Sequence, residues 1–373
     1  MPTKSDESRY QVTAAHEMLL RLAGRVPDDL LSQCRAWLAA GAYGDIARSV
    51  AFVAIMQKIA LSHEDIAILA VLLEAAGGSA ETLSEVDVVD DEPLLPYTFT
   101  TAVPGADART ADEVDRAALD TVRSQPGGLG LWRAWRHPAD GSPWPPPRRV
   151  YLVEVEGGSD LPALAARVQR DLAFAGEQDG QVEVYQSGSE LPVYHRLARS
   201  SAALLWAAAP EREIRVARVF DEVTPETGPR FHADHPRLPD AGERGRILDY
   251  LRDGTPVLVT AARMDDVVDP TKAAVVPMTF RTDGSWIWTD SVTYYLREYE
   301  LCPEEDLLTH IRQAQYRVPT VDGPAMHRVL AVLMEPPADE AAWTVGDASG
   351  NGDDLLDGER DGEIDDYPSG RRT

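Results

Sequence analysis

A repeated strand-to-helix corner in the middle of the chain constrains its fold more than any other feature. The stretches VEVEGGSDLPALAAR (153–167) and VEVYQSGSELPVYHR (182–196) both run from an alternating apolar segment into Ser, an acid, Leu and Pro, with a one-residue offset. Because proline fits the first turn of a helix, each stretch predicts a strand followed by an amphipathic helix. Strands separated by helices favour parallel pairing. We therefore expect a βαβαβ parallel-sheet segment over 148–222.

The segments on either side of this sheet carry different patterns. Residues 10–78 place apolar side chains at helical spacing between Gly and Pro stop signals, which predicts a bundle of four helices. Residues 79–147 are rich in acids and prolines, which is typical of a linker region with some local order. Residues 240–335 predict an α+β segment with a β-hairpin, either continuous with the 148–222 sheet or separate from it. From 337 to 373 the chain has eleven acids against three Arg, a composition typical of a disordered tail. The expected fold class is α/β and α+β multidomain.

The net charge of −26 narrows the class of partner. Phosphate binding needs clustered Lys and Arg, so this charge argues against nucleic acid and against anionic membrane surfaces. It suits a soluble protein, and it would steer a basic protein partner toward the surface. No apolar run is long enough to cross a bilayer, and the polar N-terminus has no signal-peptide core. Cys34 and Cys302 form no metal or redox spacing, so we expect a cytoplasmic protein without disulfides.

The sequence contains none of the common catalytic signatures. There is no P-loop, no H-E-x-x-H, no G-x-S-x-G and no G-x-G-x-x-G after a strand, so an enzyme is the less expected class and no cofactor is predicted. His232 and His235 form an H-x-x-H, for which Asp221 or Asp240 could supply a third zinc ligand. A solvated or locally hydrogen-bonded pair is the simpler interpretation. His195 lies on a predicted helix without a spaced nucleophile, which favours a structural role.

The two corners give one candidate ligand site. They hold Ser159, Asp160, Ser187 and Ser189. Such corners lie at the carboxyl ends of parallel strands, where open α/β sheets bind ligands, and the free N–H groups of a helix N-terminus can hold an anion. Ser and Asp are also ordinary N-caps, and Asp160 would repel a phosphate. Both interpretations stay open: a small-molecule site, or helix capping alone.

A second candidate site is the aromatic hairpin in FRTDGSWIWTDSVTYYLREY. The Asp-Gly pair at 283–284 predicts a two-residue turn, which would pair Arg281 with Trp286. One hairpin face is then apolar core, whereas the other carries Arg281, Trp286 and Trp288. Trp, Tyr and Arg are enriched at interface hot spots, so this face is either a binding platform or a surface covered by helix 291–299. The candidate binding residues are Arg281, Trp286, Trp288, Tyr294 and Tyr295.

Two stretches resemble known sequences. RLAGRVPDDLLSQCRAWLAAG and FRTDGSWIWTDSVTYYLREYELCPEEDLLTHIR resemble segments of uncharacterised actinobacterial proteins. The second is similar to proteins encoded near polymorphic toxins, where acidic immunity proteins are common, so the resemblance implies an immunity or accessory role. The segment from residue 149 also resembles a TIR-like or flavodoxin-like sheet. It lacks the motif around the catalytic Glu of NAD-cleaving TIR domains, so that activity is not implied.

Two functional hypotheses follow. The first is a non-enzymatic acidic protein that binds a protein partner, as an immunity or accessory protein. The second is a small-molecule-binding sensor or an enzyme domain whose site lies at the carboxyl ends of the 150–220 sheet. An exposed apolar or acidic surface would favour the first hypothesis, whereas a concave pocket at Ser159, Ser187 or nearby polar groups would favour the second. The oligomeric state stays open.

Overall fold

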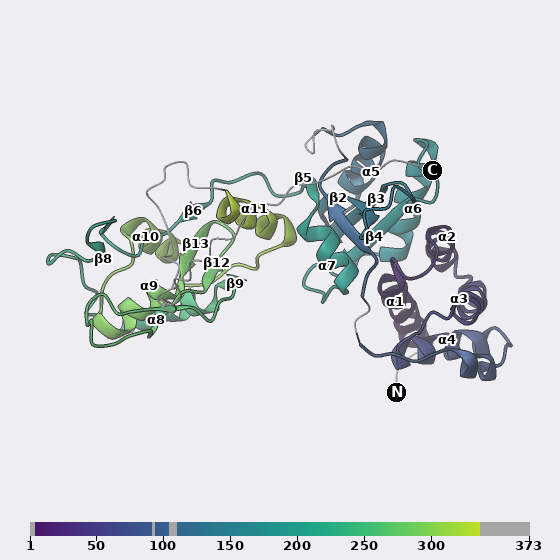
Figure 1. The fold of residues 1–373 in the computed structure, drawn as a ribbon, viewed down its shortest axis with the longest axis horizontal. Coiled ribbons are helices and arrows are strands. Elements are labelled where there is room, and N and C mark those ends of the chain that lie inside the picture. Colours follow the sequence, from purple (N-terminus) through teal and green to yellow (C-terminus); the bar gives the residue numbers. More distant parts are fainter. Residues whose placement is uncertain (1–3, 92–93, 104–109, 336–373) are drawn as a thin grey trace, which may run out of the picture.

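The N-terminal part of the chain is a group of four helices. The computed structural model describes residues 4–91, 94–103 and 110–335, and Figure 1 shows these helices beside the central sheet. The helices are α1 (Lys4–Leu22), α2 (Asp28–Ala39), α3 (Tyr43–Gln57) and α4 (His63–Ala75). The Ser62 hydroxyl accepts a hydrogen bond from the Asp65 N–H at 3.0 Å and so caps the start of α4. The four helices predicted in this part of the chain are confirmed.

A five-stranded mixed sheet follows the helices. Its strands are β1 (Tyr97–Thr100), β2 (Gly128–Pro138), β3 (Arg148–Val155), β4 (Gln181–Gln186) and β5 (Ala203–Ala207). The order is β1-β2-β3-β4, and β5 pairs with a different stretch of β2 from the one that β1 contacts. Strands β3 and β4 are parallel and are joined by helix α6 (Leu161–Phe174), as predicted. Because the other pairs in this sheet are antiparallel, the prediction of a fully parallel βαβαβ segment is wrong.

Residues 79–147, predicted to be a linker region with some local order, are more ordered than expected and contribute two strands to the first sheet. This segment supplies η1 (Ala80–Glu85), strand β1, helix α5 (Glu113–Ser124) and the interior strand β2. β2 buries two arginines, Arg133 against Asp115 at 2.5 Å and Arg136 against Asp28. A half-buried strand is recognised by alternating apolar and polar residues. In β2 the buried ion pairs place charged residues at interior positions, so the alternation is hidden and does not reveal this strand.

Helices cover both faces of the first sheet. Helices α5 and α6 pack on the face that carries Val153 and Val155. Helices α1 and α7 (Val193–Ser200) pack on the opposite face, which carries Leu152. Gly24, in the left-handed region at φ +74°, lies so close to α7 that a Cβ there would be 2.6 Å from the Tyr194 ring. The N-terminal helices and the sheet therefore share one hydrophobic core.

A second, smaller sheet lies in the C-terminal half. Its strands are ordered β6 (Arg215–Val216), β13 (Trp286–Thr289), β12 (Phe280–Thr282) and β9 (Thr255–Leu258). Helices α8 (Ala241–Asp253), α9 (Asp290–Tyr299) and α10 (Glu305–Gln313) pack around it. Strand β6 comes from the segment that was expected to complete the first sheet, so that assignment is wrong. Two short hairpin-like pairs accompany this sheet: β7 (Glu222–Thr224) with β8 (Gly228–Arg230), and β10 (Arg263–Met264) with β11 (Val276–Pro277).

Helix α11 (Gly323–Met334) packs against the first sheet and lies between the two sheets in Figure 1. The Gly323 N–H donates to Glu154 Oε1 at 3.1 Å. A Cβ at position 323 would lie 1.8 Å from Glu154 Oε2, so the close approach of this helix needs glycine. Arg328 extends the contact by donating to the carbonyls of Ala209 and Pro210.

The remaining expectations concern the chain as a whole. The described part is a mixed helix-and-sheet fold that begins with helices, as predicted. Its division into separate domains stays a prediction. The tail at 337–373, predicted to be disordered, lies outside the described residues. Within the described ranges, none of the helices is long and apolar enough to cross a membrane.

Candidate functional site

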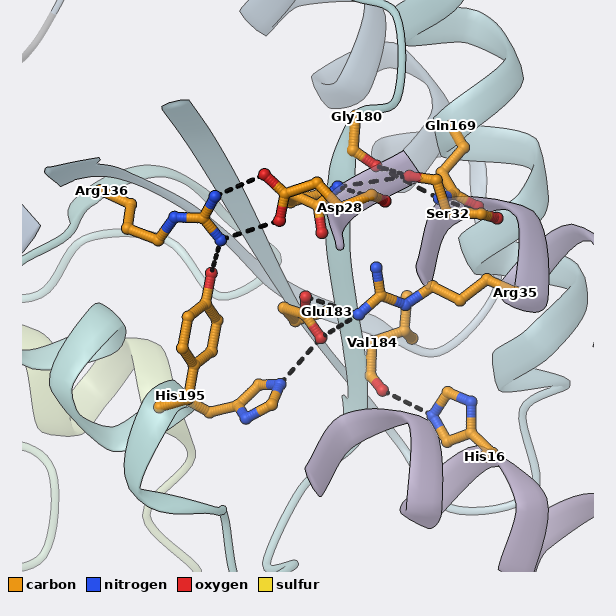
Figure 2. A network of polar contacts seen from close by, with 12 residues as sticks. His16, Asp28, Ser32, Arg35, Arg136, Gln169, Gly180, Glu183, Val184 and His195 are labelled. Carbon is orange, nitrogen blue, oxygen red and sulfur yellow. Dashed lines mark hydrogen bonds and ion pairs between the residues drawn. The ribbon is translucent and has the colours of Figure 1, made fainter. Parts of the chain in front are cut away.

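A buried polar network joins the N-terminal helices to the first sheet (Figure 2). At its centre, Arg35 Nη2 on α2 donates to both carboxylate oxygens of Glu183 on β4, each at 2.6 Å. His195 on α7 places its Nε2 2.8 Å from Glu183 Oε2. The three side chains are only 0–2% exposed. Because the partners come from three elements, the network connects α2 and α7 through the edge strand β4.

The charges in this network compensate one another. Burial by itself would raise the pKa of Glu183, but Arg35 and then His195 lower it to about 2. Glu183 is therefore ionised at neutral pH. Its stabilising contribution is present above the ordinary Glu pKa of 4.5 and is lost as the pH falls toward 2. None of the three residues lines the cavity described below, which indicates a structural connection rather than a reaction centre.

A second set of contacts holds the same interface. Arg136 on β2 donates to both carboxylate oxygens of Asp28 and, at 3.2 Å, to the Tyr194 hydroxyl. The Ser32 hydroxyl donates to the Gly180 carbonyl at 3.1 Å. Figure 2 shows these contacts beside the Arg35–Glu183 pair. The start of α2 is therefore fixed to the sheet by several polar contacts as well as by apolar packing.

His16 on α1 links this network to a cavity. Its Nε2 lies 2.8 Å from the Val184 carbonyl (Figure 2). Burial lowers the pKa of His16 from 6.5 to about 4, and Arg35 and His195 act in the same direction. His16 is therefore neutral at pH 7, with Nε2 as the donor to the carbonyl and Nδ1 as an acceptor. The same side chain lines the cavity.

The cavity lies between α1 and the corner that joins β4 to α7. It encloses about 560 Å³ and is lined by residues of α1, of the segments near 62 and 90, and of 185–196. Its wall combines apolar side chains such as Leu20 and Leu191 with charged ones such as Arg25 and Asp65. Volumes of about 300–1,000 Å³ are typical of small-molecule sites. The chain thus holds a pocket of small-molecule size at the carboxyl end of a parallel strand.

The two predicted corners have different surroundings. Ser189 lines the cavity, whereas Ser159, Asp160 and Ser187 do not. Asp160 caps α6, because its Oδ1 accepts a first-turn N–H of that helix at 3.0 Å. Ser187 donates to Glu154 Oε1 at 2.6 Å, the same oxygen that receives the N-terminus of α11. Of the four candidate residues, the structure therefore brings Ser189 to the pocket.

The aromatic hairpin belongs to the hydrophobic core. Trp286 and Trp288 are 6% and 0% exposed and pack with α8 and α10. Tyr294 and Tyr295 are buried in a different cluster. Arg281 forms an ion pair at 2.6 Å with the first residue of α9 and does not stack on Trp286. The four aromatic side chains are therefore closed to solvent, whereas Arg281 is half-buried, and the five residues do not form one open surface. A binding role for them stays a prediction.

The register of the hairpin also differs from the prediction. Arg281 pairs with Trp288 instead of Trp286, because the turn lies one residue further along the chain. Asp283 Oδ1 accepts the N–H groups of Ser285 and Trp286, both at 2.8 Å, and this local bonding selects the turn. The cross-strand partner changes by two residues, so each side chain keeps its predicted face.

Sequence reasoning missed a polar cluster beneath this turn. The Asp283 carboxylate is buried, accepts a hydrogen bond from the Tyr250 hydroxyl at 2.6 Å, and lies 2.5 Å from His310 Nε2. Tyr250 comes from α8 and His310 from α10, so the cluster ties both helices to the hairpin. The Asp-Gly pair signals a turn, but no sequence pattern identifies the side chains that approach it.

The H-x-x-H pair is held by hydrogen bonds to protein groups. His235 Nδ1 lies 2.9 Å from Asp221 Oδ2, and His235 Nε2 lies 3.0 Å from the Cys302 carbonyl. His232 Nε2 lies 3.6 Å from Glu222. In the part of the chain that the structure describes, no group of three His, Cys, Asp or Glu side chains is arranged to hold a metal ion.

The chain has no match among known protein-family models, curated proteins or solved structures. Its function therefore has to be argued from the site. The cavity and the buried network beside it are the two features on which that argument rests.

Acidification is expected to weaken the contact between α1 and the sheet through His16. The pKa of His16 is lowered in the fold, so its stabilising contribution is complete above the ordinary value of 6.5 and is lost as the pH falls toward 4. Between pH 7.5 and pH 5.0 this amounts to about 2 kcal/mol of the free energy of unfolding. Urea unfolding of the natural chain and of His16→Gln, whose amide can still donate to Val184, measures the difference. An equal pH dependence in both proteins would contradict the assignment.

Proposed function

We propose that this protein binds a small molecule in the cavity between α1 and the β4-to-α7 corner. The observation that carries the proposal is the cavity of about 560 Å³ to which Ser189 contributes. It lies at the carboxyl end of β4, one of two parallel strands, which is the usual position of ligands in open α/β sheets. A concave pocket at this corner is the feature expected of a sensor or an enzyme, and not of a protein-binding module.

We favour a sensor over an enzyme because the cavity wall continues into the buried network. His16 lines the cavity and donates to Val184, which is the neighbour of Glu183 on β4. A ligand that moves α1 would therefore act directly on the contacts that hold the helices to the sheet. Coupling of this kind needs two arrangements of packed elements, which a seam between a helical group and a sheet can provide. We assign this activity to the cytoplasm.

A second candidate function is the binding of a protein partner, as an immunity or accessory protein. The observation in its favour is that Phe52 and Met56, one helical turn apart on α3, are 64% and 66% exposed. The net charge of −26 would steer a basic partner toward the chain. A pull-down with the full chain at several salt concentrations tests it. A partner that the double variant Phe52→Ser, Met56→Ser retains equally well would argue against this surface.

The small-molecule proposal is tested by thermal unfolding of the full chain against a metabolite library. The library should contain anionic, cationic, zwitterionic and neutral compounds. Binding to the folded state alone adds about 2.7 kcal/mol of stability at a ligand concentration of about 100 Kd. We expect at least one compound class to raise Tm. The Ser189→Trp variant, which places a large side chain at the cavity wall, should lose that increase.

The matched control is Ser159→Trp, at the neighbouring corner that does not line the cavity. This variant should keep the increase in Tm. The proposal is wrong if no class stabilises the natural chain, or if the compounds that do so stabilise Ser189→Trp equally well.

A further inference from the structure

One residue of the cavity wall carries an acceptor that none of the described residues uses. Asp65 lines the cavity and is 0% exposed. Its Oδ1 accepts a hydrogen bond from Arg21 Nε at 2.8 Å, whereas its Oδ2 has no hydrogen-bond partner in the part of the chain that the structure describes. A buried carboxylate oxygen without a donor costs free energy, and native proteins rarely leave one unpaired. A ligand that brings an N–H donor would remove this cost.

The same cavity holds a cation with spare donors. Arg25 lines the cavity, and among the described residues its guanidinium donates one hydrogen bond, from Nη2 to the Ala60 carbonyl. No carboxylate of the described residues lies within ion-pair distance of it. Burial lowers the pKa of Arg25 from its ordinary value, while the charge of Asp65 acts in the opposite direction. The two side chains therefore influence each other electrostatically without touching.

The N-terminus of α7 adds to the attraction for an anion near Arg25. Helix α7 begins after Pro192 without a side-chain cap and has no acid in its first turn. Pro192 and Val193 line the cavity, and Gly24, the neighbour of Arg25, packs against the Tyr194 ring of this helix. Uncapped N–H groups and the helix dipole favour a negative group at this position, in addition to the guanidinium.

The rest of the wall suits an apolar body. Leu20 and Leu191 line the cavity and are buried, and the half-buried Val89 lines it as well. Acids and arginines both occur in the wall, so a ligand of a single charge sign would meet groups that repel it as well as groups that attract it. A molecule with both signs separated on an apolar frame meets each requirement.

We propose that the cavity binds a zwitterionic small molecule with an aliphatic body, of the class of apolar amino acids and short apolar peptides. Its ammonium group donates to Asp65 Oδ2, its carboxylate receives Arg25, and its aliphatic part lies against Leu20 and Leu191. This inference rests on the proposed small-molecule function and specifies its ligand class. It assigns recognition to Arg25 in the turn between α1 and α2 and to Asp65 on α4, and not to the corner serines.

Isothermal titration calorimetry with the full chain tests the ligand class. The zwitterionic probes are L-leucine and leucyl-leucine. Two matched probes each lack one charge: 3-methylbutylamine has no carboxylate, and 4-methylpentanoate has no ammonium. We expect at least one zwitterion to bind at least tenfold more tightly than both single-charge probes.

Two variants test which residue binds each charged group of the ligand. Arg25→Gln should weaken the zwitterion at least tenfold and abolish its advantage over 3-methylbutylamine. Asp65→Asn should abolish its advantage over 4-methylpentanoate. Because Asp65→Asn removes the buried negative charge that pairs with Arg21 and so also affects folding, the Arg25 variant and the truncated probes test the inference independently of it. Arg48→Gln, at an exposed pair away from the cavity, is the control and should bind as the natural chain does.

The outcomes separate this inference from the broader proposal. If 3-methylbutylamine or 4-methylpentanoate binds more tightly than both zwitterions, the zwitterionic ligand class is wrong, but the proposal of a small-molecule cavity stands. Binding of the zwitterions that Arg25→Gln leaves unchanged overturns the assigned geometry. If both zwitterions fail while another library class gives an increase in Tm that Ser189→Trp loses, the inference fails and the proposed function stands.

Discussion

Replacement of Arg35 by Met is expected to lower the free energy of unfolding by about 3–5 kcal/mol. The substitution leaves the Glu183 carboxylate buried with His195 as its remaining partner. An ionised carboxylate in such surroundings needs compensation, and Arg35 is the main cause that lowers its pKa. Because Met has a similar length and packs well in apolar surroundings, the loss reports the missing charge more than a cavity. Urea unfolding followed by far-UV circular dichroism measures it.

Two further variants make the Arg35 result specific. Arg48 forms an ion pair with Asp45, and the two side chains are 57% and 50% exposed. Arg48→Met breaks this pair and should lower the free energy of unfolding by less than about 1 kcal/mol. The double variant Arg35→Met, Glu183→Gln removes both charges and should recover part of the loss. A cost for Arg35→Met no greater than that of Arg48→Met would contradict the importance of the buried pair.

Replacement of Trp288 by Ala is expected to lower the free energy of unfolding of the C-terminal part by about 3–5 kcal/mol. The indole is fully buried among α8, α9 and α10, and its Nε1 donates to the Leu251 carbonyl at 3.0 Å. Gly254 packs so closely that a Cβ there would lie 2.2 Å from the ring. The loss of the ring therefore leaves a cavity and an unpaired carbonyl at once. Chemical unfolding monitored by tryptophan fluorescence and circular dichroism measures the change.

The matched control for this variant is Trp144→Ala, because Trp144 is 78% exposed. Its removal should change the free energy of unfolding by about 0.5 kcal/mol or less. Trp288→Phe should fall between the two, since it keeps most of the ring volume and loses the bond to Leu251. An open aromatic platform would instead predict a stable Trp288→Ala variant, so that result would restore the binding hypothesis for this hairpin.

Much of the local structure could be predicted from the sequence. Helical spacing and stop signals revealed the four N-terminal helices, and the repeated corners revealed β3, α6, β4 and α7. The hairpin faces were also predicted correctly, although its register was not, because an even shift leaves each side chain on its face. These features depend on residues close together in the chain.

The larger errors have a common cause. Strand β2 escaped detection because Arg133 and Arg136 are buried against carboxylates from α5 and α2, which hides the apolar pattern of an interior strand. Strand β6 was assigned to the wrong sheet because two residues that pair with β13 carry no signal of their partner. In each case a segment far away in the chain supplies the opposite charge or the backbone hydrogen bonds that allow the local sequence to form a strand.

The same distinction between local and distant residues applies to the candidate site. By itself the sequence determined the strand-to-helix corner, and hence that Ser189 stands at the carboxyl end of a strand, because periodicity and the Leu-Pro helix start are local properties. Only the tertiary structure decided that His16, Arg25 and Asp65 meet this corner and enclose a cavity. It also decided that the aromatic hairpin is core. The burial and pairing of charges depend on which distant elements pack together. The spacing of residues along one segment carries no information about that packing.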